Sequence, residues 1–464
     1  MTVTQPDERS DMEVYAETIH QCLYLIRTKD KHLWPISHRE RAVHYRGPEE
    51  AIEKKQLTVP AVVDVLAYLS VRREHGRVAL TFATSPTHVT LYVCQDERKD
   101  PKLPDHILNL WSLLRRLKEA IDTSDAAKVT ATRKALQITL FRACMHRVVE
   151  ALQAQRDSYK YYTDTMRGLQ GIEEAENLER VLGTIDGLYD TLVGRGDSAM
   201  SFPDEDCIAI AESCSMLTDM LYTPYPYAKW HKTYRDVAGC RTLFTLASYI
   251  YSILGLSRAV QYLSLISSIN SPLRDILVNM PEIIMIPTSD HYIATVDASP
   301  EALFDLLQDA VEKPSPSLTF DQFRSRLLDE IPQLDPKAGA TMRGSAHCEC
   351  ALAVYIYNNL IESSHIGISS KPCYPCSLFL TAYKIGGKFL TNTFDQLYSE
   401  EFELPWNLPS PLLDISDSSS QVDERSTSLI WKRMLDRLVV HLEIIWSKEG
   451  QEELDWFKQY ILHR

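Results

Sequence analysis

The chain has little glycine and no long apolar segment. Its 464 residues include 16 glycines, below the usual share of about 7%, which disfavours a site built on a glycine-rich phosphate-binding loop. The longest uncharged apolar stretch, residues 242–257, is shorter than the roughly 20 residues that a membrane-spanning helix needs. The N-terminal residues show no basic stretch followed by an apolar core. We therefore expect neither a secretory signal peptide nor a transmembrane helix, and no membrane partner.

Positive charge is also in short supply. With 49 Lys and Arg against 63 Asp and Glu, the net charge is −14, so the chain lacks the overall positive field of many nucleic-acid-binding proteins. Without an export signal we expect an intracellular protein, cytoplasmic or nuclear, whose thiols stay reduced. The ten cysteines are then expected to be buried, catalytic or metal-bound rather than paired in disulfides.

Helical periodicity dominates the first part of the chain. Residues 1–275 read mostly as helices, with an apolar stripe at Leu136, Leu140, Val148 and Leu152 that predicts a core-facing helix. The exception is residues 78–95, a Val- and Thr-rich stretch with Ser-Pro-Thr in its middle. This pattern predicts two strands joined by a turn.

The second part of the chain is mixed. Residues 276–404 contain two strand-like segments between 282 and 299 and several short helical patterns. A Pro- and Ser-rich tract at 405–428 predicts a flexible linker, and residues 429–464 read as a helical segment. We therefore expect an α+β or α/β protein with a mainly helical N-terminal region and a smaller mixed domain at 276–404.

One cluster of residues carries recognisable chemistry. Four of the ten cysteines lie between Cys348 and Cys376, where uniform scatter would place fewer than one. The cluster reads His347-Cys348-Glu349, then Pro372-Cys373-Tyr374-Pro375-Cys376. Both motifs precede apolar runs and so open helices, with the β-branched segment 365–370 between them as a short buried strand.

The residue types suit zinc. Zn²⁺ takes imidazole nitrogen and thiolate sulfur in tetrahedral geometry, and Cys373 and Cys376 would share one face of a helix. With His347 they make three ligands, which leaves the open position of a catalytic site. Glu349, two residues from His347, is then placed to move a proton, a role that a structural zinc site does not need.

Other interpretations of the same residues stay open. Cys348, Cys350, Cys373 and Cys376 could form a closed structural site, although Cys348 and Cys350 point roughly 200° apart on a helix. Cys373 and Cys376 alone could be a redox pair. By itself, each of Cys348 and Cys350 reads as a buried core residue, and His365 as a structural histidine.

The spacing H-x-E…P-C-x-x-C resembles the signature of the cytidine deaminase-like zinc enzymes. The Ser369-Ser370-Lys371 lead-in to Pro372 is similar to the largely fungal nucleic acid/nucleotide deaminase branch, in which small or apolar residues stand where this chain has Cys348 and Cys350. The resemblance covers about residues 340–395. It implies an α/β/α deaminase-like domain with His347, Cys373 and Cys376 as zinc ligands and Glu349 as proton shuttle.

The resemblance also implies a reaction. Zinc-bound hydroxide would attack the carbon that bears an exocyclic amine of a nucleobase, and ammonia would leave. The substrate would be a nucleoside, a nucleotide or single-stranded nucleic acid, and Lys371 could meet a phosphate. The alternative is a catalytically inactive, zinc-stabilised interaction protein with the same fold.

The family fold needs two strands before the motif helix, and the sequence offers two sources for them. The segments between 282 and 299 are nearest to the motif, with helical patterns between. The pair at 78–95 is the other source. In that case the long helical region would be an insertion within one composite domain.

Overall fold

The structure, a computed structural model, describes most of the chain between residues 59 and 380 and a helix near the C-terminus. The described residues are 17–19, 21–22, 25, 59–72, 76–85, 88–96, 100–193, 202–223, 225–238, 244–268, 272–288, 292–297, 299–310, 319–330, 340–344, 347–359, 361, 365–369, 376, 378–380, 432–440 and 442.

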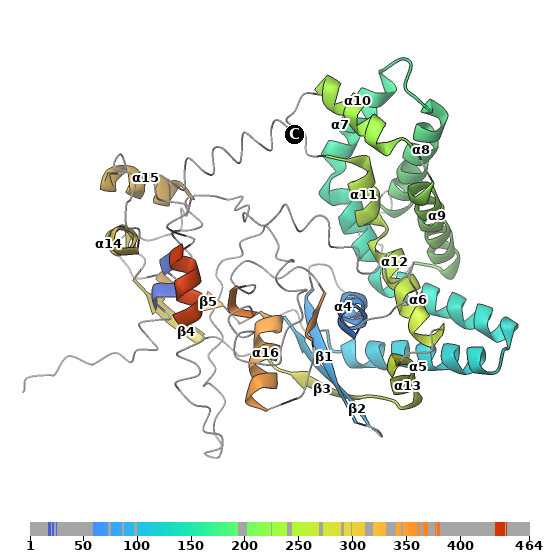
Figure 1. Cartoon of the computed structure of the whole chain (residues 1–464), viewed down its shortest axis with the longest axis horizontal. Coiled ribbons are helices and arrows are strands. Elements are labelled where there is room, and N and C mark those ends of the chain that lie inside the picture. The colour runs from blue at the N-terminus through green and yellow to red at the C-terminus, as the bar shows by residue number, and fades with distance from the viewer. Residues whose placement is uncertain are drawn as a thin grey trace, which may run out of the picture.

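A four-stranded mixed sheet holds the functional motif in place, with strand order β3-β2-β1-β6. Strands β1 (Val78–Thr84) and β2 (Val89–Gln95) form an antiparallel hairpin, which confirms the pair predicted at 78–95. Strand β3 (Glu282–Ile286) runs parallel to β2, and the two-residue strand β6 (Gly367–Ile368) runs antiparallel to β1. The predicted boundary at residue 275 therefore separates strands of one sheet (Figure 1).

The two strand-like segments between 282 and 299 both form strands, but they belong to different sheets. Strand β3 pairs with β2, whereas β4 (Tyr292–Val296) pairs with β5 (Ala340–Gly344) in a two-stranded antiparallel sheet. Helices α14 (Pro300–Ala310) and α15 (Phe320–Glu330) lie between β4 and β5 in the chain. In the chain, the motif helix therefore comes directly after the two-stranded sheet, although it packs on the four-stranded sheet.

Helices cover both faces of the four-stranded sheet (Figure 1). Helix α4 (Val59–Ser70) packs on the face that carries Val78 and Leu80. Helix α16 (Cys348–Asn358) packs on the opposite face, against Ala79 and Cys94. Neighbouring residues point to opposite sides of a strand, so the run Val78-Ala79-Leu80 serves both layers. The fold is α+β, as expected, with an α–β–α arrangement around the motif.

A helical region lies between β2 and β3 in the chain and packs against α4. None of the helices that the structure describes combines the length and the apolar character needed to cross a bilayer. The helices of this region are α5 (Leu103–Asp122), α6 (Ala126–Ala154), α7 (Arg156–Arg167), α8 (Ala175–Leu192), α9 (Asp204–Tyr222), α10 (Tyr227–Ala238), α11 (Leu246–Ile253), α12 (Gly255–Ser268) and α13 (Pro272–Asp275), the last followed by a 3₁₀ turn, Ile276–Val278.

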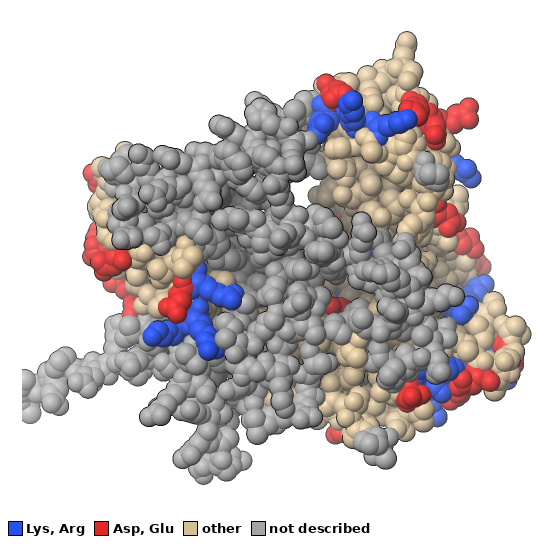
Figure 2. Space-filling view, in the orientation of Figure 1, with Lys and Arg blue, Asp and Glu red and all other residues tan. Residues whose placement is uncertain are grey.

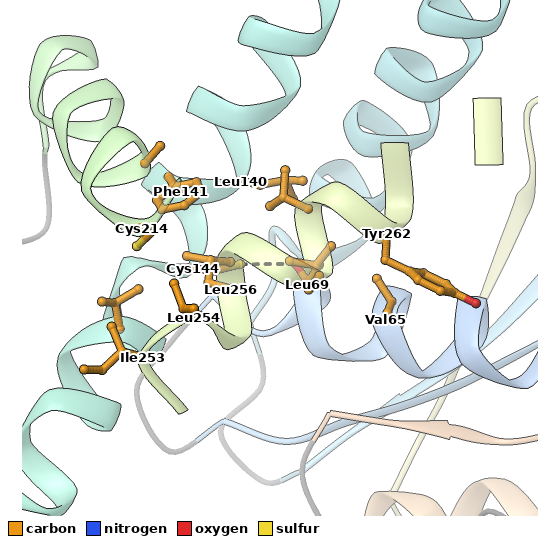
Figure 3. Packing of buried hydrophobic residues seen from close by; sticks show 14 of the residues in the cluster. Val65, Leu69, Leu140, Phe141, Cys144, Cys214, Ile253, Leu254, Leu256 and Tyr262 are labelled. Carbon is orange, nitrogen blue, oxygen red and sulfur yellow. Dashed lines mark hydrogen bonds between the residues drawn. The ribbon is translucent and has the colours of Figure 1, made fainter. Parts of the chain in front are cut away.

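Helix α6 joins the helical region to α4. The predicted apolar stripe is buried along it, including Leu136, Leu140, Val148 and Leu152. The helix is kinked at Cys144, whose φ of −118° and ψ of 16° are not helical. Cys144 Sγ donates a hydrogen bond to the Leu69 carbonyl of α4 at 3.3 Å (Figure 3). Burial raises the pKa of Cys144 to about 12, so it stays a neutral thiol in this contact.

The predicted C-terminal helix is confirmed over the residues that the structure describes. Residues 432–440 and 442 are helical, and Met434, Leu438 and Leu442 are buried at helical spacing. The predicted linker at 405–428 lies outside the described residues.

Candidate metal centre

The N-terminus of α16 presents the first half of the motif. The His347 carbonyl accepts hydrogen bonds from the backbone N–H groups of Cys350 and Ala351, each at 3.0 Å. His347 therefore stands at the beginning of the helix, as predicted, and Glu349 lies in its first turn. The positive end of the helix dipole favours a carboxylate at this position.

The structure brings His347, Glu349 and Cys376 together. Cys376 Sγ lies 3.2 Å from His347 Nδ1, and Glu349 Oε1 lies 4.0 Å from the same nitrogen. One possible ligand atom from each residue falls within 4.8 Å of the others. These three side chains come from segments almost thirty residues apart, so their meeting is a property of the fold.

The distance between His347 and Cys376, and the chemistry of their ligand atoms, fit a metal ion. Nitrogen and sulfur ligands of a tetrahedral zinc, at about 2.0–2.1 and 2.3 Å from the ion, lie roughly 3.5 Å apart. The observed 3.2 Å between His347 Nδ1 and Cys376 Sγ is close to that separation. The 4.0 Å to Glu349 Oε1 exceeds the roughly 3.4 Å expected between nitrogen and oxygen ligands of one ion. His347 and Cys376 could therefore hold a metal ion, with the carboxylate of Glu349 beside it.

Glu349 is buried and held from its far side. Its side chain is 4% exposed, and Cys348 Sγ donates to Glu349 Oε2 at 3.4 Å. Burial, and then the negative charge of Glu349, raise the pKa of Cys348 well above its ordinary value. Cys348 is thus a neutral hydrogen-bond donor, and the second oxygen of Glu349, Oε1, faces His347.

Cys348, Cys350 and His365 contribute to packing and hydrogen bonding around the site. Among the described residues, neither Cys348 nor Cys350 belongs to the group that could hold a metal, and Cys350 is fully buried. His365 is buried, and its Nε2 lies 2.9 Å from Asp64 Oδ1 on α4. The His365 carbonyl accepts a hydrogen bond from Thr81 Oγ1 at 2.6 Å. These contacts fit the expected structural role of His365.

The second half of the motif is described in part. Cys376 is buried and helical, as are residues 379 and 380, in agreement with the helix predicted there. Cys373 and Lys371 lie outside the described residues, so the third predicted ligand and the predicted phosphate contact remain predictions. The described part of the predicted site is His347, Glu349 and Cys376.

The long-range contacts of two residues, Ser369 and Arg147, carry no signal in the sequence. Ser369 follows β6 and is buried, with its N–H bonded to the Val78 carbonyl and its Oγ accepting from the Val78 N–H, both at 2.9 Å. Arg147 of α6 donates to the Ser369 carbonyl at 3.3 Å. Because these partners are far apart in sequence, local patterns of residues do not reveal them.

Comparison of the chain with protein-family models, with curated proteins and with solved structures finds no match. The functional inference therefore depends on the motif and on the geometry of the residues that it brings together.

Proposed function

We propose that this protein is a zinc-dependent hydrolytic deaminase of a nucleobase. The observation that carries the proposal is the meeting of His347, Cys376 and the buried carboxylate of Glu349. A structural metal site has no use for a buried carboxylate beside two ligands, whereas hydrolysis needs a group that accepts and returns a proton. The proposal takes zinc as the metal because imidazole and thiolate together suit that ion.

The order of elements around the motif supports a cytidine deaminase-like domain. That fold needs two strands before the motif helix, and α16 packs on β1, β2 and β3. Strand β6 and the helical residues at 376 and 378–380 then follow α16. This is the composite arrangement considered from the sequence, in which the helical region is inserted between β2 and the motif helix.

The proposed roles of His347, Glu349 and Cys376 follow from the positions of their side chains, and that of Cys373 follows from the motif. The ion would be held by His347, Cys376 and Cys373. When bound, it would act as a Lewis acid and lower the pKa of a water molecule toward about 7. Glu349 would accept a proton at Oε1 from the attacking water and deliver it to the departing amine, so that C–NH₂ and H₂O become C=O and NH₃. Cys348 holds the carboxylate through Oε2, which leaves Oε1 available for this transfer.

The charges of the helical region favour a small substrate over a long polynucleotide. Several basic side chains of α5 and α6 are paired with carboxylates, as in Arg115–Glu119, Lys118–Asp122 and Arg142–Asp204. On the face shown in Figure 2, positive and negative side chains are intermixed over the helical region. A groove for a polynucleotide would need positive charge that is not neutralised in this way. We therefore propose a nucleoside or nucleotide as the first class of substrate to test.

Metal content and ammonia release test the proposal. The purified full chain should carry about one zinc, measured by mass spectrometry of the metal, and a reducing intracellular setting would keep its thiolate ligands intact. It should release ammonia from at least one amine-bearing nucleoside, nucleotide or single-stranded oligonucleotide. A zinc-loaded chain that consumes no member of such a panel would exclude the deaminase.

A second candidate function is an inactive, zinc-stabilised interaction protein. It requires the apolar side chains exposed on the helical region to form one contiguous patch, because patches of that kind often mark contact surfaces. Tyr161, Met216, Tyr222 and Val237 are each 46–55% exposed on α7, α9 and α10. This candidate predicts that removal of zinc lowers the melting temperature although no substrate is ever consumed.

A further inference from the structure

Arg147 connects the helical region to the strand that precedes the metal ligand Cys376. Its Nη2 donates to the Ser369 carbonyl at 3.3 Å, across 222 residues of sequence. Its guanidinium carbon lies 4.7 Å from the centre of the Tyr68 ring on α4, within the range of a cation–π contact. Arg147 thus touches both the layer below the sheet and the end of β6.

Strand β6 needs support from side chains. It pairs with β1 over Gly367 and Ile368 only, so few ladder hydrogen bonds fix its position. Ser369 extends the pairing through two hydrogen bonds with Val78. The Ser369 N–H donates to the Val78 carbonyl, and the Val78 N–H donates to the Ser369 hydroxyl oxygen. The contact from Arg147 uses the Ser369 carbonyl, so every polar group of this residue is bonded. Ser369 is therefore a fixed point from which the chain continues towards Cys376.

The surroundings of Arg147 indicate that it does not serve as one half of a surface ion pair. Among the described residues, no carboxylate lies within ion-pair distance of it, whereas Lys128 and Arg142 on the same helix are both paired. Arg147 is half-buried, one turn beyond the kink at Cys144 that bonds α6 to Leu69 (Figure 3). The kink and the ring of Tyr68 hold the guanidinium where it meets Ser369.

We propose that Arg147 is a positioning residue for the metal centre. By holding the Ser369 carbonyl, it fixes the start of the segment that carries Cys376, and so the distance between the two halves of the ligand set. The inference rests on the metal site of the proposed function and deepens it. It assigns to the inserted helical region a direct part in building the site.

The test compares variants of the full chain. Arg147→Met removes the donor and the charge but keeps an unbranched stem. Arg147→Lys keeps the charge but loses the planar group that stacks on Tyr68. Arg142→Met is the matched control, because Arg142 lies on the same helix and donates its Nε to a backbone carbonyl, that of Phe202 at 3.4 Å, within the helical region.

Three measurements are made on each variant. Zinc affinity is obtained by competition with a chelator. The geometry of the site is obtained from the visible spectrum of the Co²⁺-loaded chain. The stability of the segment that leads to Cys376 is obtained from hydrogen exchange in the peptide that contains Ser369 and Cys376. We expect Arg147→Met to raise the zinc Kd about tenfold, the lower end of the effect of supporting residues at metal sites. It should also change the Co²⁺ bands and speed exchange, with Arg147→Lys intermediate and Arg142→Met within about twofold of wild type.

The outcomes separate this inference from the proposed function. Equal zinc Kd and equal exchange in wild type and Arg147→Met would overturn the role of Arg147, as would the same loss in Arg142→Met. If Arg147→Met does not fold, Arg147→Lys decides in the same way. If the wild type binds zinc but deaminates no substrate, the proposed deaminase function is wrong. The zinc Kd values of wild type and Arg147→Met can still be compared, so the role of Arg147 is still tested. If the wild type binds no zinc, there is no metal centre to position, and the role of Arg147 is overturned together with the site.

Discussion

Replacement of Glu349 by glutamine tests the proton-transfer role with little change in shape. In the wild type, Cys348 Sγ donates a hydrogen bond to Glu349 Oε2 at 3.4 Å. Glutamine keeps the length of the side chain and an oxygen that can accept this hydrogen bond. It removes the capacity of Oε1, 4.0 Å from His347 Nδ1, to take a proton. The variant therefore changes one chemical property of the site and leaves its packing.

The expected loss of activity is large because the carboxylate is buried. A positioned acid or base contributes typically 10²–10⁴-fold, which is about 2.7–5.4 kcal/mol of transition-state stabilisation. Glu349 is 3% exposed, so bulk water has little access to replace it as the base. We therefore expect kcat/KM to fall by about 10³-fold or more. A neutral amide costs less to bury than a carboxylate, so the melting temperature should fall by no more than a few degrees.

The assay follows ammonia release with the best substrate from the panel, together with zinc content and melting temperature. Glu282→Gln is the control, since Glu282 begins a strand of the same sheet and is exposed, 3.0 Å from His88. It should leave kcat/KM within about twofold of wild type. If Glu349→Gln retains both zinc and activity within about threefold, Glu349 is not the proton shuttle. Loss of zinc in this variant would instead make Glu349 a ligand.

The other predictions concern the supports of the site. In Gly367→Ala the new Cβ would lie 2.3 Å from the Val63 carbonyl oxygen of α4, so urea unfolding should show a loss of about 1–3 kcal/mol; Gly183→Ala, which meets nothing within 4 Å, should gain up to about 1 kcal/mol. Cys376→Ser should lower zinc content well below one per chain, and an unchanged content would exclude Cys376 as a ligand. Burial raises the pKa of Cys144 from 9.0 to about 12, so its contribution to stability is full below pH 9 and is lost as the pH rises towards 12. Between pH 8 and pH 10 the wild type should lose roughly 1 kcal/mol more of its unfolding free energy than Cys144→Ala, and equal losses in the two proteins would refute this.

Local patterns predicted the elements better than their partners. Alternation and the Ser-Pro-Thr turn predicted the hairpin at 78–95, and apolar spacing predicted α6, because both signals lie within a few residues of each other. The pairing of β3 with β2 rather than with β4 depends on contacts about 190 residues apart, which no local period encodes. The same holds for the composite sheet that joins β1 to β6.

The candidate site shows the same division. The spacing of the motif predicted His347, Glu349 and Cys376, since zinc chemistry restricts which residue types can act as ligands. The thiol of Cys348 as a donor to Glu349 was missed, because the sequence marks Cys348 only as a buried core residue. The contact between Arg147 and Ser369 was missed because it joins segments that are far apart in the sequence.

The order in which the strands of the sheet are made has a consequence for synthesis of the protein. Thr81 of β1 and its partner His365, at the entry to β6, are 284 residues apart. At about 5–20 residues per second, a ribosome needs roughly a quarter of a minute to a minute to make the second after the first. Throughout that time one edge of the hairpin has no strand beside it, and such an edge is a place where chains associate wrongly. The helical region is made during this interval. Because it packs with α4 over one face of the hairpin, it can shield that face before the candidate metal ligands have been translated.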